Sequence, residues 1–155
     1  MAINKQPVFT AQPILKVTRI PWEEFTTFDP SSARSSSINI LTALDSFGTL
    51  IERITIQPMA SPYGYASIST KLLYVSVYDY NVNRASILAV KKWNALDMGS
   101  TFIEPPYWEL TFAGGIILDI DDELLIAQAI YDGTRPTNSG DGLLVTIEGS
   151  TYTAP

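Results

Sequence analysis

The chain has 155 residues, of which 46% are hydrophobic and 17% are charged, a composition typical of a single globular domain. It contains neither cysteine nor histidine, which excludes disulfides, thiolate zinc sites and the Ser-His and Cys-His catalytic arrangements. Residues 1–92 hold nine Lys and Arg against six Asp and Glu, whereas residues 93–155 hold one against ten. Because the acidic C-terminal part repels phosphate, we expect no nucleic-acid partner. Since cysteine and histidine are absent, we also expect neither enzymatic activity nor a cofactor.

The N-terminal residues lack the apolar core of a signal peptide, and no stretch of the chain has 18 consecutive apolar residues. The sequence therefore predicts a soluble protein that is made in the cytoplasm and has no membrane partner.

Residues 1–37 differ from the rest because prolines are spaced through them and a serine cluster ends them. Proline fixes φ and favours an extended preceding residue, so we predict an extended N-terminal arm in which residues 14–20 could add to a sheet edge. The arm is too apolar for a solvated tail and must lie on its own domain or on a neighbouring subunit. We predict partner contacts at Phe9, Ile14, Val17, Ile20, Trp22 and Phe25.

Residues 38–155 are predicted to form one β-domain, which begins with a strand at 38–44 and continues with a strand at 49–57. Successive strand residues face opposite sides, which places Leu50, Ile54 and Ile56 on one face and Ile51 on the other. Pro58, which cannot donate to a ladder, ends this second strand.

Five further strands follow, separated by turn-forming residues. They are predicted at 69–80, 85–93, 107–113, 124–131 and 143–148, and alternation in the last places Leu143, Val145 and Ile147 inward and Thr146 and Glu148 outward. A helix over 85–96 is the competing interpretation of the second of these, but no clear cap favours it, and Gly114-Gly115 is expected to break the third. Seven or eight strands with turn signals every eight to twelve residues indicate an all-β antiparallel sandwich or barrel.

Few residue groups suggest chemistry. The acidic run at 119–123 could supply oxygen ligands to Ca²⁺ but lacks the EF-hand pattern, so a polar turn explains it better. Glu104 and Glu109 near Trp108 lack the pairing that a glycosidase needs. Aromatic side chains on a proline-flanked loop are seldom part of a core, so Tyr63 and Tyr65 are also predicted as partner-binding residues.

One motif carries a resemblance to a known family. The chain reads Gly-Thr-x-Ile-x-x-Ile-x-Ile-Gln-Pro at 48–58, has a turn-rich loop at 132–142 and closes with a strand at 142–149. In these features, and in the turn within 116–126, it resembles the small jelly-roll accessory proteins of tailed-bacteriophage capsids. The resemblance covers residues 38–150 and does not extend to the arm.

The resemblance implies a decoration, or cement, protein with a jelly-roll β-sandwich. Such a protein binds the outer surface of the major capsid protein shell in the virion, commonly as a homotrimer, and stabilises it without chemistry. The alternative of another class is a carbohydrate- or receptor-binding module of a fibre or tail, which would use Tyr63, Tyr65 and Trp108.

Overall fold

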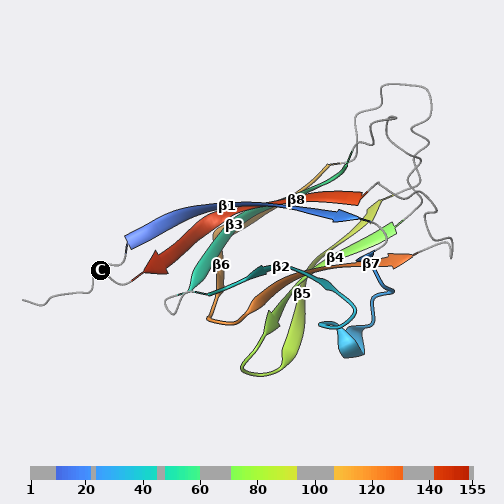
Figure 1. The fold of residues 1–155 in the computed structure, drawn as a ribbon, viewed down its shortest axis with the longest axis horizontal. Coiled ribbons are helices and arrows are strands. Elements are labelled where there is room, and N and C mark those ends of the chain that lie inside the picture. The colour runs from blue at the N-terminus through green and yellow to red at the C-terminus, as the bar shows by residue number, and fades with distance from the viewer. Residues whose placement is uncertain are drawn as a thin grey trace, which may run out of the picture.

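The computed structural model describes residues 10–21, 24–44, 48–59, 71–93, 107–130 and 142–153. These residues form eight β-strands and one short 3₁₀ turn (Figure 1). The elements are β1 (Thr10–Pro21), η2 (Pro30–Ser32), β2 (Ile38–Thr42), β3 (Thr49–Pro58), β4 (Lys71–Asp79), β5 (Arg84–Trp93), β6 (Trp108–Leu118), β7 (Glu123–Ile130) and β8 (Gly142–Thr153). No helix in the described part of the chain is long and apolar enough to cross a membrane.

The strands form two four-stranded antiparallel sheets that pack as a sandwich (Figure 1). The first sheet has the order β1-β8-β3-β6, and the second has the order β2-β7-β4-β5. The all-β antiparallel architecture predicted from the turn spacing is therefore confirmed. The strand predicted at 85–93 is β5, so the helical alternative for this segment is wrong.

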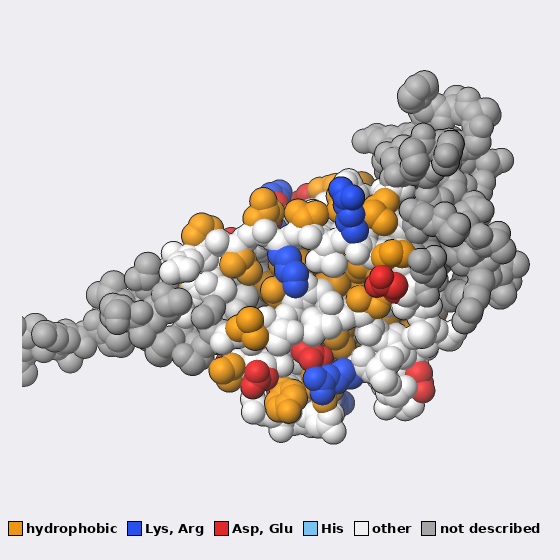
Figure 2. Space-filling view, in the orientation of Figure 1, with side chains coloured by type: hydrophobic (Ala, Val, Ile, Leu, Met, Phe, Trp, Pro, Cys, Tyr) orange, Lys and Arg blue, Asp and Glu red, His pale blue; other side chains and the backbone are white. Residues whose placement is uncertain are grey.

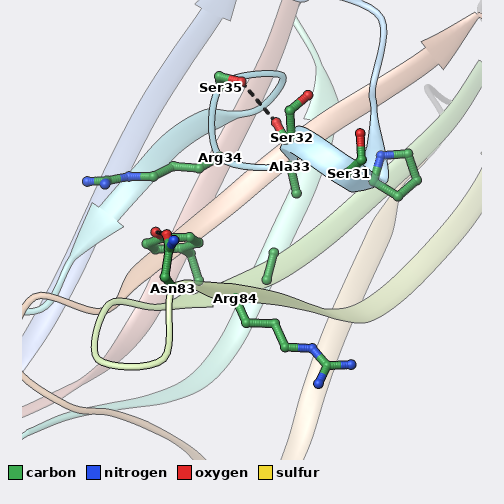
Figure 3. Close-up of a pocket in the computed structure, with 10 residues that line it drawn as sticks. Ser31, Ser32, Ala33, Arg34, Ser35, Asn83 and Arg84 are labelled. Atoms are coloured by element: carbon green, nitrogen blue, oxygen red, sulfur yellow. Dashed lines mark hydrogen bonds between the residues drawn. The ribbon is translucent and has the colours of Figure 1, made fainter.

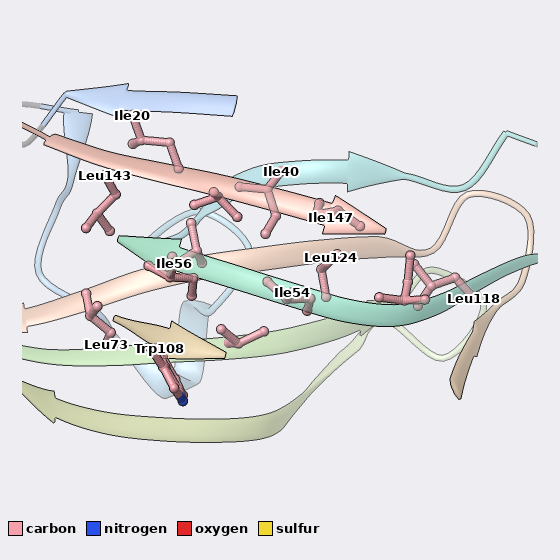
Figure 4. Packing of buried hydrophobic residues seen from close by; sticks show 14 of the residues in the cluster. Ile20, Ile40, Ile54, Ile56, Leu73, Trp108, Leu118, Leu124, Leu143 and Ile147 are labelled. Carbon is pink, nitrogen blue, oxygen red and sulfur yellow. The ribbon is translucent and has the colours of Figure 1, made fainter. Parts of the chain in front are cut away.

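The core lies between the sheets and consists almost entirely of branched aliphatic side chains (Figure 4). Alternate residues of β8 point into it, since Leu143, Val145 and Ile147 are fully buried while Thr146 and Glu148 are not. This is the inward and outward pattern that the sequence predicts for the strand. From β4, Leu73 and Val75 enter the core from the opposite sheet.

The facing of β3 differs from the prediction because the strand contains a bulge. Register with β8 shifts between Ile51 and Arg53, which leaves Glu52 as an extra residue. An extra residue reverses the alternation, so Ile51 and Ile54 both point into the core and Leu50 lies on the outer face. The prediction that Leu50 shares the face of Ile54, and that Ile51 lies on the other face, is therefore wrong. Pro58 ends the strand as predicted.

Gly114-Gly115 does not break the strand at 107–113, contrary to the prediction. β6 runs through both glycines, and its pairing with β3 shifts register at this point. Both glycines have positive φ, 82° and 75°, and a Cβ on Gly115 would lie 2.3 Å from a methyl carbon of Leu50. Residues without a Cβ are needed for such a bulge, so the pair bends β6 instead of ending it.

The predicted arm contributes a strand to the sandwich. β1 pairs with β8 along its whole length, from Thr10 opposite Thr153 to Pro21 opposite Gly142. Strand pairing therefore begins inside the segment that was assigned to the arm, and residues 10–21 are the outermost strand of the first sheet. Residues 1–9 lie outside the described part of the chain.

Candidate interaction surface

The outer face of the second sheet is covered by residues 24–37, which we call the cover segment. Its Phe28 ring stacks on Tyr74 of β4 with 4.5 Å between centroids, and its Phe28 N–H donates to the Gln128 carbonyl of β7. Beneath it, Leu125 and Ala127 of β7 are each only 1% exposed. Over β7 and β4 this face is therefore used within the chain, whereas Ile87 and Val90 of the edge strand β5 stay 50% exposed on it.

Arg34 anchors the cover segment. Its Nε and Nη2 donate to the two carboxylate oxygens of Glu123 at 2.9 and 2.7 Å, and the guanidinium lies 4.8 Å from the centroid of the Tyr78 ring and 5.6 Å from that of Tyr80. The hydrogen bond to Glu123 raises the pKa of Arg34, so the guanidinium stays charged. A bidentate pair stacked on aromatic rings is a geometry that lysine cannot reproduce.

We expect Arg34→Lys to lower the urea midpoint of unfolding much more than Arg53→Lys does. Arg53 pairs with Glu148, but both side chains are well exposed, whereas the Glu123 side chain is only 11% exposed and depends on Arg34 for compensation. Solvent screens the Arg53–Glu148 pair more than the Arg34–Glu123 pair, in which only the arginine is well exposed. Equilibrium urea unfolding followed by circular dichroism measures both midpoints, and equal shifts would contradict this role of Arg34.

A polar groove of about 810 Å³ lies between η2 and the β4–β5 turn (Figure 3). Serine hydroxyls of the cover segment line one wall, and Asn83 and Arg84 line the other. The Tyr78 hydroxyl donates to the Asn83 side-chain oxygen, and Arg34 is held by Glu123. Figure 3 shows that Arg34 and Arg84 point in different directions, so the two guanidinium groups do not converge on a common ligand.

The outer face of the first sheet, in contrast, carries exposed apolar side chains that no described element covers. Leu15 and Val17 of β1 are 70% and 56% exposed, and Ile117 of β6, at the opposite edge, is 68% exposed. Between them, the Arg53–Glu148 ion pair crosses from β3 to β8. Figure 2 shows that exposed hydrophobic side chains occur in small groups among charged ones on the side of the molecule drawn there. The outer face of the first sheet itself combines the apolar Leu15, Val17 and Ile117 with the Arg53–Glu148 pair, and non-obligate protein interfaces have a similar mixture.

An apolar groove adjoins this face where the two sheets meet at β1 and β2. It has a volume of about 430 Å³ and lies between Ile14 and Lys16 of β1 on one side and Leu41 on the other. Leu44, at its rim, is 77% exposed. The free edge of β1 therefore runs beside an open apolar groove.

The residues predicted as arm contacts do not form one surface. Ile20 and Phe25 are 1% and 9% exposed and belong to the core cluster, so their side chains are used inside the sandwich. Ile14 is half-buried against the core, and Val17 is exposed. Phe9 and Trp22 lie outside the described residues.

The other predicted site residues do not form one site in the described part of the chain either. Tyr63 and Tyr65 lie outside the described residues, and so does Glu104. Trp108 is buried in the core at the start of β6, where it cannot stack on a sugar as the alternative function requires. Glu109 is exposed and accepts a hydrogen bond from the Tyr107 hydroxyl at 2.8 Å.

The acidic run forms the turn between β6 and β7. Asp122 accepts from the backbone N–H groups of Tyr80 and Asp119 at 3.1 and 3.0 Å, so its carboxylate ties this turn to the β4–β5 hairpin. Across the described ranges, no group of three or more acidic side chains is placed to hold a metal ion.

Sequence analysis did not identify Leu15 and Ile117 as surface residues. Leu15 could have been found from alternation, since Ile14, Lys16, Thr18 and Ile20 share one face of β1 and the odd-numbered residues share the other. Ile117 could not, because its facing depends on the bulge at Gly114-Gly115.

The chain matches no protein-family model, no curated protein and no solved structure. The uncovered outer face of the first sheet and the free edge of β1 are therefore the features from which its function has to be inferred.

Proposed function

We propose that this chain is a jelly-roll decoration, or cement, protein that binds the outer surface of a tailed-bacteriophage capsid and stabilises the assembled shell. The jelly-roll part is supported by the strand pairs β1–β8, β2–β7, β3–β6 and β4–β5. These are the pairs of one long hairpin that is rolled into two sheets. Viral capsid domains commonly use this architecture.

The observation that carries the capsid-binding part is the difference between the two outer faces. The cover segment occupies β7 and β4 on one face and leaves only the edge strand β5 open there, whereas no described element covers the other face, which presents Leu15, Val17 and Ile117. An uncovered four-stranded sheet face suits the broad surface of an assembled shell better than it suits a small ligand, which binds in a concave pocket.

The proposed mechanism is mass action and needs no bond to be made or broken. A protein that binds the assembled shell more tightly than the free subunits stabilises the shell by the difference in binding free energy. Many copies on one particle add avidity if the copies also contact one another. The homotrimer that the resemblance implies is one way to make such contacts.

We expect Ile117→Glu to weaken binding to capsid shells by at least about tenfold, because it replaces an exposed apolar side chain of the proposed interface with an unpaired charge. Shells purified from a virus that lacks the protein are mixed with the purified chain, and the bound fraction is measured by co-sedimentation. Val82→Glu is the matched control, since Val82 is 65% exposed in the β4–β5 turn, away from this face. Equal binding by Ile117→Glu and the wild type would refute this face as the contact, and no binding by the wild type would refute the proposed function.

A further inference from the structure

The second feature without a described partner is the free edge of β1. β1 is an outermost strand of twelve residues, and its pairing with β8 shows no register shift. Within the described residues, nothing pairs with its other edge. Natural proteins protect edge strands by shortening, bulging or covering them, or by placing Lys and Pro on them, because free N–H and C=O groups pair with other chains. β1 carries Pro13, Lys16 and Pro21, but it is long and has no bulge.

The hydrogen bonds of β8 establish which groups of β1 are free. The N–H of Tyr152 donates to the Gly48 carbonyl, and the carbonyl of Gly142 accepts from Met59, so the even-numbered residues of β8 bond toward β3. Neighbouring residues of an antiparallel strand bond to opposite sides. The odd-numbered residues of β8 therefore bond to β1, where the register places even-numbered residues opposite them.

It follows that the odd-numbered residues of β1 direct their N–H and C=O groups to the free edge. Pro13 and Pro21 fit this assignment, since both have odd numbers and a proline has no N–H to give to β8. Between them, Leu15, Val17 and Arg19 present complete donor and acceptor pairs. The available ladder is thus bounded by prolines that lie four residues on either side of Val17.

We propose that β1 pairs with β1 of a second copy of this chain, antiparallel and with the two-fold axis at Val17. Antiparallel pairing of two identical strands has a two-fold axis, and an axis at Val17 is the one that sets Pro13 opposite Pro21. Val17 then lies opposite Val17 of the second copy, Leu15 lies opposite Arg19, and the prolines lie at both ends, where no N–H is needed. The two first sheets become one continuous eight-stranded sheet.

Charge is compatible with the same register and excludes two others. With the axis at Val17, each Arg19 faces a leucine, and Lys16 faces Thr18, so no two cations are directly opposite. Leu15 also lies beside Glu148 on β8. In the proposed register, Arg19 of the second copy, Leu15 and Glu148 therefore lie side by side across three neighbouring strands. A register centred on Arg19 or on Lys16 would instead place like charges opposite each other.

Pairing by β1 also explains the exposure of its side chains. Leu15 and Val17 would be flanked by the second copy's β1, and the apolar groove beside Ile14 and Leu41 would be closed on its open side. An extended segment of another protein could occupy the same edge, and the mass measurement below separates that case from self-pairing.

The first test removes the free N–H at the axis. We expect the wild-type chain to sediment at twice the monomer mass of 17.1 kDa at micromolar concentration, and Val17→Pro to sediment as a monomer with an unchanged circular dichroism spectrum, because residue 17 gives no N–H to β8. If Val17→Pro fails to fold, Val17→Lys takes its place, since it sets two cations opposite each other at the axis.

The second test measures register by cysteine cross-linking, for which the natural chain has no competing thiol. Opposite residues of a hydrogen-bonded pair have Cα atoms about 5.5 Å apart, within the range of disulfides. Val17→Cys should therefore form a disulfide-linked dimer under mild oxidation. Leu15→Cys is the matched control on the same strand, because its two copies would lie about 14 Å apart along the ladder.

A monomeric or trimeric wild-type chain would overturn the proposal, and so would equally fast cross-linking of Leu15→Cys and Val17→Cys. A monomer that binds an extended capsid peptide at β1 would overturn self-pairing in favour of a heterologous strand. The inference does not rest on capsid binding: the mass and cross-linking results concern the isolated chain, whereas Ile117→Glu concerns the shell.

Discussion

Gly149→Ala is expected to destabilise the fold by about 3 kcal/mol, near the upper end of the range for overpacking substitutions. Gly149 lies in β8, between β1 and β3, and a Cβ there would come within 1.9 Å of the Leu50 carbonyl oxygen and 3.2 Å of the Ile51 Cα. These are backbone atoms of a central strand, so they cannot move aside as a flexible side chain would. Urea unfolding measures the loss as a fall in midpoint with little change in slope.

Gly114→Ala is the matched control for this prediction. Gly114 has a φ of 82°, but no atom lies within 4 Å of the position that a Cβ would take. The substitution therefore pays only the cost of a left-handed conformation, about 1 kcal/mol. A Gly114→Ala variant as unstable as Gly149→Ala would show that close approach at the β3–β8 contact does not limit stability.

Ile54→Ala is expected to cost about 2–5 kcal/mol, since it removes three buried carbons from the centre of the core and leaves a cavity. Ile54 is fully buried and packs between the sheets (Figure 4). Its control is Ile117→Ala on the adjacent strand, where the same change at a 68% exposed side chain should stay within about 0.5 kcal/mol.

The Ile54→Ala comparison also checks the β3 bulge. If the bulge at Glu52 were absent, Ile51 would face outward, and Ile51→Ala would behave like the exposed control. With the bulge, Ile51→Ala should cost about as much as Ile54→Ala, because both side chains are buried. A mild Ile51→Ala would therefore contradict the observed register of β3.

Sequence analysis predicted the strands well where a regular pattern continued without interruption. β8 alternates from Leu143 to Glu148, and the sequence places each of these side chains on the correct face. β3 and β6 alternate only on either side of a bulge, and one inserted residue inverts the facing of everything that follows. The sequence marks such a position only weakly, by Glu52 on an apolar face and by Gly114-Gly115.

The candidate surface was less predictable than the fold. Burial of Ile20 and Phe25 depends on how β1 and the cover segment pack on the sheets, and no local pattern carries that information. The proline spacing was visible, but it was interpreted as the sign of an arm. The pairing of β1 with β8 is needed to see that Pro13 and Pro21 both face the free edge of the strand, where no N–H has to be given to β8.

The pairing of the first strand with the eighth has a consequence for the order of folding. β1 contacts only β8 in its sheet, and more than a hundred residues separate them, so a large loss of chain entropy precedes their contact. During synthesis β1 must wait for β8 to leave the ribosome. Until then one edge of β3 is unpaired, and this interval is when the nascent chain is most exposed to aggregation.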